Sequence, residues 1–310
     1  MDIVEQLRQK ARSKQKTIIL PEYNDKRVVE AAKIIEKEQI AKVIFLTPDK
    51  VDPQTKQRYI QEYYNLRKAK GVILDDVKAL FDEDTLYYGA MMVRDGKADG
   101  FVAGACHTTP EMARAAIHCL DLDERFTIAC SCFIMAVPDC AYGDHGNFVF
   151  ADCGIIPEPN SRQLACISVA TAEMAAKVLG LKPRVALLSY STKGSAKARS
   201  MEKIQEALGM IKEMAPDLLV DGELQVDAAI VPEVAKIKYP DSPIGGQANI
   251  LIFPDLDAGN IGYKLVQRLG KARAIGPLIL GLNKPCSDLS RGCIADDVVD
   301  CVAVTAIRAQ

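Results

Sequence analysis

The stretch 276–299 brings together several residue types that could do chemistry. An apolar run ends in a polar turn that carries Ser290 and Arg291, and a helical pattern with Asp296 and Asp297 follows. This order predicts a strand, an exposed loop and the first turn of a helix. Because ligands of open α/β sheets bind beyond the carboxyl ends of the strands, we expect a ligand at this loop. Residue types alone leave a serine nucleophile, a metal site and a phosphate cradle open.

A second loop follows a strand predicted at 100–103 and holds His107, Thr108 and Thr109. It leads into a helix whose exposed backbone N–H groups would attract an anion, and Arg114, one turn further on, would reinforce that attraction. The alternative is an ordinary helix cap, which by itself explains Thr109. A cap does not explain why the end of the strand is so small and polar.

A third loop, 189–195, contains Ser191 and Lys193 among other hydroxyl groups and a glycine, and it precedes a helix predicted at 196–214. This composition is typical of a phosphate cradle, which combines backbone and hydroxyl donors with one cation. The Walker pattern GxxxxGK[ST] is absent. A solvated helix cap remains the alternative, because Ser and Thr often cap helices.

Two later strands also lead into polar segments. After a strand predicted at 218–220, Asp221 and Glu223 are expected to open a helix, because acidic side chains favour that end. After a strand predicted at 249–253, small residues around Asn260 would let the backbone lie close to a neighbour.

A polar helix predicted at 54–70 ends in a basic segment that includes Arg67. The simpler interpretation is a solvated helix C-terminus, where cations interact favourably with the helix dipole. Runs of charge usually lie on such solvated faces, so the residues alone assign Arg67 no ligand.

Composition restricts the class of protein. The chain has 310 residues, of which 49% are hydrophobic and 26% charged, so it can form one large or two ordinary globular domains. The net charge is −2 and the basic residues are dispersed, which gives no footprint for nucleic acid. The apolar runs are shorter than a membrane span, and the first residues lack the apolar core of a signal peptide. We expect no nucleic-acid or membrane partner.

The ten cysteines do not have the spacing of a metal site, since no CxxC pair occurs. Most lie in apolar segments, where a free thiol behaves as a small hydrophobic side chain. We expect reduced, structural cysteines in a cytoplasmic protein.

Predicted strands and helices alternate along the chain, which indicates α/β units and mostly parallel sheets. The strands are predicted at 17–20, 42–46, 100–103, 126–137, 147–152, 184–188, 218–220, 249–253 and 274–282. The helices are predicted at 3–12, 25–37 with Asp25 as the cap, 54–70, 84–95, 160–179, 196–214 and 296–308.

Four stretches resemble the phosphate acetyl/butyryltransferase family in order and spacing: SYSTKGSA, DGELQVDAA, ANILIFPDLDAGNIGYKLVQRLG and GPLILGLNKPCSDLSRGC. The earlier stretch GACHTTPEMARAA resembles the same family, so the resemblance covers essentially the whole chain. The first two stretches look more like the acetyl-transferring members.

The resemblance implies an α/β fold of two α/β/α three-layer domains, with mostly parallel sheets and an active-site cleft between the domains. Domain I would be discontinuous and comprise 1–125 and 278–310, and domain II would comprise 126–277. The family also implies a homodimer.

The reaction that the resemblance implies is reversible: acetyl-CoA and phosphate give acetyl phosphate and CoA by direct transfer in a ternary complex. CoA and acetyl-CoA would be substrates, with no tightly bound cofactor, no metal and no acyl-enzyme. Ser290 and the cysteines would then not be nucleophiles.

The family's catalytic serine, arginine and aspartate match Ser290, Arg291 and Asp297. Two arginines that bind CoA or its phosphoryl groups match Arg114 and Arg67. The remaining candidates for contact with CoA or phosphate are Thr108, Thr109, Ser191, Lys193 and Asn260.

Thiolate attack on acetyl phosphate requires loss of the CoA proton, and a thiol pKa of ~8.5 leaves little thiolate at neutral pH. Asp297 is the expected base, although an aspartate of pKa ~3.9 is weak unless burial raises that value, and a helix N-terminus lowers it. Arg291 and Ser290 would donate hydrogen bonds to the oxyanion.

Three alternatives remain from the sequence. The chain could transfer a longer acyl group, as phosphate butyryltransferase does, because one or two methylenes change binding by only about 1–3 kcal/mol. It could be a non-catalytic module that senses acyl-CoA or acyl phosphate, although retention of Ser290, Arg291 and Asp297 argues against that. A nicotinamide dehydrogenase of related shape would need GxGxxG after a strand, which is absent.

Overall fold

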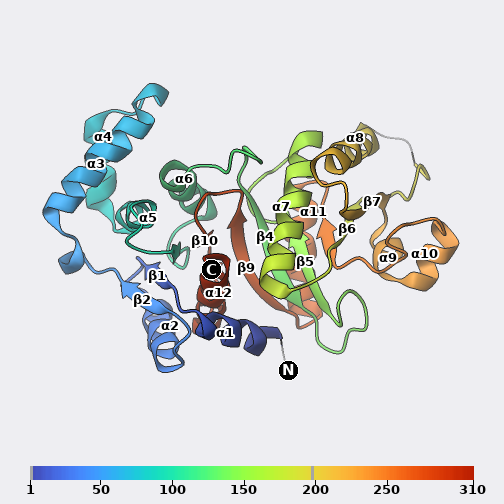
Figure 1. Ribbon diagram of the computed structural model, residues 1–310, viewed down its shortest axis with the longest axis horizontal. Coiled ribbons are helices and arrows are strands. Elements are labelled where there is room, and N and C mark those ends of the chain that lie inside the picture. The colour runs from blue at the N-terminus through green and yellow to red at the C-terminus, as the bar shows by residue number, and fades with distance from the viewer. Residues whose placement is uncertain (1–2, 197–198) are drawn as a thin grey trace. The chain divides into compact units, whose positions relative to one another are not determined.

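The structure, a computed structural model, describes residues 3–196 and 199–310. The chain forms two compact units: unit 1 comprises Met1–Ala129 with Gly281–Gln310, and unit 2 comprises Cys130–Leu280. Each unit contains strands that alternate with helices (Figure 1), which confirms the predicted α/β class.

Unit 1 is built on four parallel strands in the order β2-β1-β3-β10. The strands are β1 (Thr17–Leu20), β2 (Lys42–Phe45), β3 (Gly100–Val102) and β10 (Cys286–Ser287). Ile18, Ile19 and Leu20 are fully buried, as expected for a parallel strand that is covered on both faces. Since all four strands are parallel, the loops that follow them leave from one edge of the sheet.

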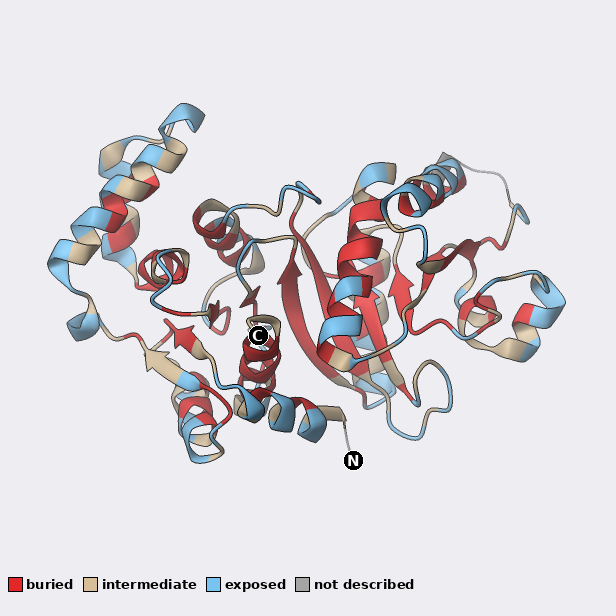
Figure 2. Ribbon diagram, in the orientation of Figure 1, coloured by how far each residue is buried: buried red, intermediate tan, exposed pale blue. Residues whose placement is uncertain are grey.

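The helices of unit 1 are α1 (Ile3–Ser13), α2 (Lys26–Lys37), α3 (Pro53–Arg67), α4 (Leu74–Glu83), α5 (Leu86–Arg94), α6 (Thr109–Leu120) and α12 (Ala295–Arg308). Helix α12 packs on β1, β3 and β10 and is buried along most of its length (Figure 2). Helix α2 begins after Asp25, whose carboxylate accepts the Arg27 N–H at 2.8 Å, so the predicted cap is confirmed.

Unit 2 has six strands in the order β9-β4-β5-β8-β6-β7, and only β4 runs opposite to its neighbours. The strands are β4 (Cys130–Ala136), β5 (Asn147–Ala151), β6 (Arg184–Leu188), β7 (Leu219–Leu224), β8 (Ile250–Ile252) and β9 (Arg273–Leu280). The helices are α7 (Ser161–Leu179), α8 (Arg199–Met214), α9 (Val226–Ile230), α10 (Pro232–Lys238) and α11 (Leu256–Leu269). Helices α7 and α11 lie on opposite faces of these strands (Figure 1).

The strand predicted at 126–137 begins only at Cys130. The preceding residues form a turn in which the Phe126 and Thr127 N–H groups donate to the Asp123 carbonyl at 3.0 and 2.9 Å. Thr127 also has a positive φ of 60°, which a strand does not allow. Helix α4 and strand β10 were not predicted, and the first residues of the helix predicted at 196–214 include 197–198, which lie outside the described residues.

The prediction that Asp221 and Glu223 open a helix is wrong. Both lie inside β7 and are buried, and the next helix starts at Val226. Their partners come from the loop after β6: Lys193 binds Asp221 at 2.5 Å, and the Gly194 N–H donates to Glu223 at 2.6 Å. These tertiary contacts outweigh the local preference of acids for a helix start.

Among residues 3–196 and 199–310, no helix is both long enough and apolar enough to cross a membrane.

Candidate active site

Three loops meet at the carboxyl ends of the parallel strands of unit 1. They follow β1, β3 and β10 and carry Glu22, His107 and Arg291, respectively. This is the edge where open α/β sheets bind ligands, so the structure brings together two of the three loops that the sequence singled out.

Glu22 occupies the backbone donors of the loop after β3. Its carboxylate accepts the N–H groups of Ala105, Cys106 and His107 at 2.9, 2.8 and 3.2 Å. Burial raises the pKa of Glu22, but the hydrogen bonds from His107 and the backbone outweigh burial and leave the pKa below its usual value. The anion attracted by these N–H groups is therefore a carboxylate of the chain itself.

His107 lies between two carboxylates. Its Nδ1 is 2.8 Å from Glu22 and its Nε2 is 2.9 Å from Asp84. The hydrogen bonds to Asp84 and Glu22 raise the pKa of His107 to about 10, so the ring is an imidazolium at neutral pH. A ring that donates both protons to fixed partners stabilises the loop and is poorly suited to proton transfer.

Asp288 connects the loop after β10 to the first turn of α6. The Thr109 hydroxyl donates to its carboxylate at 2.8 Å, and burial raises the pKa of Asp288 to about 7. The loops approach so closely at Gly104, where φ is +115°, that a Cβ would lie 2.1 Å from Asp288 Oδ1 and 2.6 Å from the Leu289 nitrogen. Only glycine fits there.

Arg27 holds the same two loops through their carbonyl groups. Its guanidinium donates to the carbonyls of Arg291, Cys293 and Ala105 at 2.7, 3.1 and 2.9 Å, and it pairs with Asp25 at 2.6 Å. This role could not be predicted from residue spacing, because Arg27 and Arg291 are 264 positions apart.

Ser290 and Arg291 lie in the loop that precedes α12, and Asp297 lies in the first turn of this helix. Ser290 and Arg291 are exposed, and the Gly292 N–H donates to the Ser290 hydroxyl at 3.3 Å. Asp297 is half-buried, and one of its carboxylate oxygens accepts the Ile294 N–H at 3.0 Å. The other oxygen stays available to a ligand that reaches this turn.

Arg67 and Arg114 are brought together by His118. Arg67 Nη2 lies 2.9 Å from His118 Nε2, and Tyr63 Oη lies 2.8 Å from His118 Nδ1. Arg114 precedes His118 by one turn of α6. Burial, and then the charges of Arg67 and Arg114, lower the pKa of His118 to about 4, so this ring is neutral.

Nine of the ten arginines of unit 1 fall into two groups, and the tenth, Arg308, donates to the Cys286 carbonyl at 2.8 Å. Six pair with carboxylates: Arg8 with Asp300, Arg12 with Glu38, Arg27 with Asp25, Arg58 with Asp95, Arg94 with Asp121, and Arg125 with Asp123. Within the described part of the chain, Arg67, Arg114 and Arg291 have no such pair. These three guanidinium groups keep their charge for an external anion.

A cavity of about 610 Å³ lies beside the loop after β3. Its lining includes four carboxylates, those of Glu22, Asp82, Glu83 and Asp84. The cations in its wall are already bound, since Lys56 lies 2.5 Å from Asp82 and His107 bridges two of the acids. The excess of negative charge disfavours an anionic ligand in this cavity.

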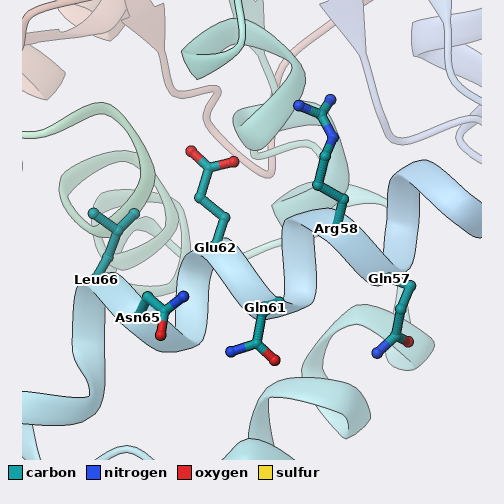
Figure 3. A pocket seen from close by; sticks show the side chains of 6 residues that line it. All are labelled: Gln57, Arg58, Gln61, Glu62, Asn65 and Leu66. Atoms are coloured by element: carbon teal, nitrogen blue, oxygen red, sulfur yellow. The ribbon is translucent and has the colours of Figure 1, made fainter.

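An open pocket of about 670 Å³ runs along α3 (Figure 3). It is lined by Gln57, Arg58, Gln61, Glu62, Asn65 and Leu66. Both charged side chains are paired, Arg58 with Asp95 at 2.6 Å and Glu62 with Arg94 at 3.3 Å. This pocket therefore offers an anion no free cation, in contrast to Arg67 at the end of the same helix.

In unit 2, the loop 189–195, which was predicted to bind phosphate, instead binds the carboxylates of Asp221 and Glu223. Lys193 pairs with Asp221 and also donates to the Gly222 carbonyl at 2.5 Å. The Ser191 hydroxyl is buried and accepts the Ala196 N–H at 3.0 Å. Asn260 donates to the Cys153 carbonyl at 3.0 Å and so fixes the loop after β5.

Thr108 is the N-cap residue of α6, and Glu111 accepts hydrogen bonds from its N–H and its hydroxyl at 2.7 and 2.8 Å. The ten cysteines are free thiols. No group of three or more His, Cys, Asp or Glu side chains in the described residues could hold a metal ion.

Residues 2–306 match the family model described as "Phosphate acetyl/butaryl transferase". The chain is 45% identical over 329 residues to a phosphate acetyltransferase of Thermoanaerobacterium thermosaccharolyticum, with 100% of both chains covered. It is 41% identical to a phosphate acetyltransferase of Bacillus subtilis, with 99% of both covered. A phosphotransacetylase structure from Streptococcus pyogenes superposes with a TM-score of 0.88 at 38% identity, over 99% of this chain and 98% of that one.

Proposed function

The chain belongs to the phosphate acetyl/butaryl transferase family, and on that premise we propose that it transfers an acetyl group reversibly between CoA and inorganic phosphate. The observation that carries the proposal is full-length similarity to acetyl-transferring relatives, together with exposed Ser290 and Arg291 in the loop before α12 and half-buried Asp297 in the first turn of that helix. An enzyme of this kind needs cationic donors for two anionic substrates, and Arg67, Arg114 and Arg291 are unpaired cations.

In the direction of acetyl-CoA synthesis, the CoA thiolate attacks the carbonyl carbon of acetyl phosphate. A C–S bond forms, the bond from the carbonyl carbon to the bridging oxygen breaks, and phosphate leaves with the electron pair. The thiol proton passes to Asp297 and from there to the departing phosphate or to water. The reverse direction uses phosphate as the nucleophile and returns the proton to the CoA sulfur.

Arg291 and Ser290 donate hydrogen bonds to the oxygen that becomes negative in the transition state. Arg27 fixes the Arg291 backbone, so the loop that carries this donor is held in place before substrate binds. Asp297 accepts the thiol proton with the oxygen that the helix cap leaves available.

Arg67 and Arg114 bind anionic groups of CoA. Thr108, Thr109, Ser191, Lys193 and Asn260 remain candidates for substrate contact. Lys193 and Ser191 already have partners within the chain, so a direct contact would require them to share or exchange these bonds.

The protein acts as a homodimer in this proposal, and helix α11 offers a surface for the second copy. Ile261, Leu265 and Leu269 recur at every fourth position and are 57%, 52% and 79% exposed. Leu265→Glu is expected to shift the molecular mass in solution from dimer to monomer. An unchanged mass would exclude this surface.

The function is tested by following thioester formation from acetyl phosphate and CoA with purified protein. The same assay with propionyl and butyryl phosphate measures the acyl preference, and acetyl phosphate is expected to give the highest kcat/KM. Folded protein that forms no thioester from any of the three would overturn the proposal, and a higher kcat/KM for butyryl phosphate would favour the butyryl alternative.

A further inference from the structure

We propose that His118, oriented by Tyr63, is a positioning residue that holds the guanidinium of Arg67 in place for an anionic group of CoA. The proposal rests on the CoA-binding role of Arg67 given above. Arg67 is the last residue of α3 and His118 lies near the end of α6, so the contact of 2.9 Å between Arg67 and His118 links the two helices at this point.

The chemistry of the contact fixes the state of the ring. A guanidinium can only donate hydrogen bonds, so His118 Nε2 must accept. The ring is then neutral and carries its proton on Nδ1, from where it donates to Tyr63 Oη at 2.8 Å. The order of donors is therefore Arg67 to His118 to Tyr63.

Tyr63 is a rigid anchor for this chain of hydrogen bonds. It is 3% exposed, and its ring packs edge-on against Phe81 and Tyr87, with centroids 5.9 and 5.6 Å away. A side chain packed in this way loses little further freedom when it orients His118.

A neutral partner orients a cation without cancelling its charge. Arg58 and Arg94 lie in the same unit but bind carboxylates, so each forms a neutral pair. Arg67 forms its described hydrogen bond with an uncharged ring, and its Nε is buried with no hydrogen-bond partner. This arrangement suits a residue that must present a full positive charge to a ligand.

Arg114 belongs to the same arrangement. It extends from α6 one turn before His118, and its charge lies close enough to disfavour protonation of the ring. Because His118 stays neutral, it adds no third positive charge beside the two arginines. CoA, which carries several phosphate charges, is the substrate that such a pair of arginines would attract.

The test compares three substitutions of His118 by steady-state kinetics. His118→Gln keeps a neutral acceptor and is expected to hold KM for CoA within about 3-fold of wild type. His118→Phe removes the acceptor and is expected to raise KM for CoA roughly 10-fold, the equivalent of one hydrogen bond to a charged group. His118→Glu keeps an acceptor but neutralises Arg67, so KM for CoA should also rise roughly 10-fold.

A merely structural role predicts a different pattern, in which KM for CoA follows thermal stability rather than the charge of the acceptor. The KM for acetyl phosphate should stay unchanged in all three variants. Equal KM values for CoA in His118→Gln and His118→Glu would overturn the proposal. If His118→Phe is too unstable to assay, Tyr63→Phe provides the same test, with an expected smaller rise in KM for CoA.

Arg67→Met separates this inference from the function on which it rests. In the Arg67→Met background, His118→Phe is expected to have no further effect on KM for CoA. An unchanged KM in Arg67→Met alone would contradict the role of Arg67. A raised KM in Arg67→Met with a normal KM in His118→Phe would contradict only the role of His118.

Discussion

Two histidines near the ends of helix α6 have opposite charge states: His107 lies in the loop just before the helix, and His118 lies in its last turn. At its start, His107 lies between Glu22 and Asp84 and is an imidazolium with a pKa raised to about 10. Near its end, His118 lies beside Arg67 and Arg114 and is neutral, with a pKa lowered to about 4. The two rings therefore differ in charge state because their hydrogen-bond partners differ, since the imidazole group itself is the same.

The difference indicates what each end of the helix does. The charged ring of His107 has a structural role. It donates to the carboxylates of Glu22 and Asp84, and Glu22 also accepts the backbone N–H groups of the loop. The neutral ring at the end leaves two arginines with their full charge. The first arrangement fixes the loops beside Ser290 and Arg291, and the second supplies a cationic grip for CoA.

The largest effect is expected from Arg291→Ala, at the loops where the acetyl group is transferred. The substitution removes a donor and a charge from the oxyanion, so kcat should fall on the order of 100-fold or more while KM for CoA changes little. Ser290→Ala, which removes only a neutral donor, should lose less. Stopped assays of thioester formation measure both, and a larger loss in Ser290→Ala would reverse the assigned roles.

Substitutions at the arginine end should affect binding instead. Arg114→Gln and Arg67→Gln each remove one charged hydrogen-bond donor, so KM for CoA should rise roughly 10- to 100-fold, with a smaller change in kcat. Arg58→Gln on the same α3 helix is the matched control, because Arg58 is bound to Asp95. A change in kcat alone in these variants would contradict the assignment of CoA binding to this end of α6.

Replacing His107 should reduce stability more than binding. His107→Gln removes two charged hydrogen bonds, and we expect the free energy of unfolding in urea to fall by about 2 kcal/mol. The exposed His145, replaced by Asn, serves as the control. A variant as stable as the wild type would show that the His107 contacts do not hold the loop.

The two rings should give pH dependences of stability with opposite signs. The pKa of His107 is raised above its ordinary 6.5, so its stabilisation is complete below pH 6.5 and is lost as the pH rises towards 10. The pKa of His118 is lowered, so stability falls as the pH drops from 6.5 towards 4, where only the unfolded chain gains this proton. The loss of stability at high pH should disappear in His107→Gln, and the loss at low pH should disappear in His118→Phe. Urea titrations across pH 4–10 measure both, and the opposite assignment of the two variants would contradict the account.

Much of the scaffold could be predicted from the sequence where local signals agree. β1 (Thr17–Leu20), β6 (Arg184–Leu188) and the Asp25 cap appear as predicted, because short apolar runs ended by polar or cap residues leave few alternatives. β10 (Cys286–Ser287) has too few residues to produce a periodic pattern. The part of β7 from Asp221 onward was mistaken for a helix start, because its buried acids depend on partners from a distant loop.

Only those residues of the site that lie in one short segment could be predicted from the sequence. Ser290, Arg291 and Asp297 lie within eight consecutive positions, so a single segment of the sequence displays them. Arg27 and His118 act through residues far away in the sequence, and neither has a distinctive neighbour in its own segment. Spatial contacts of this kind leave no mark on the residue spacing of one chain.

The most direct test of the division along α6 is a ¹⁵N NMR titration of the histidine rings in the intact protein. We expect His107 to show two protonated ring nitrogens from pH 6 to pH 9. We expect His118 to stay neutral throughout this range, with its proton on Nδ1. A protonated His118 at pH 6, or a proton on its Nε2, would contradict a neutral ring that accepts from Arg67.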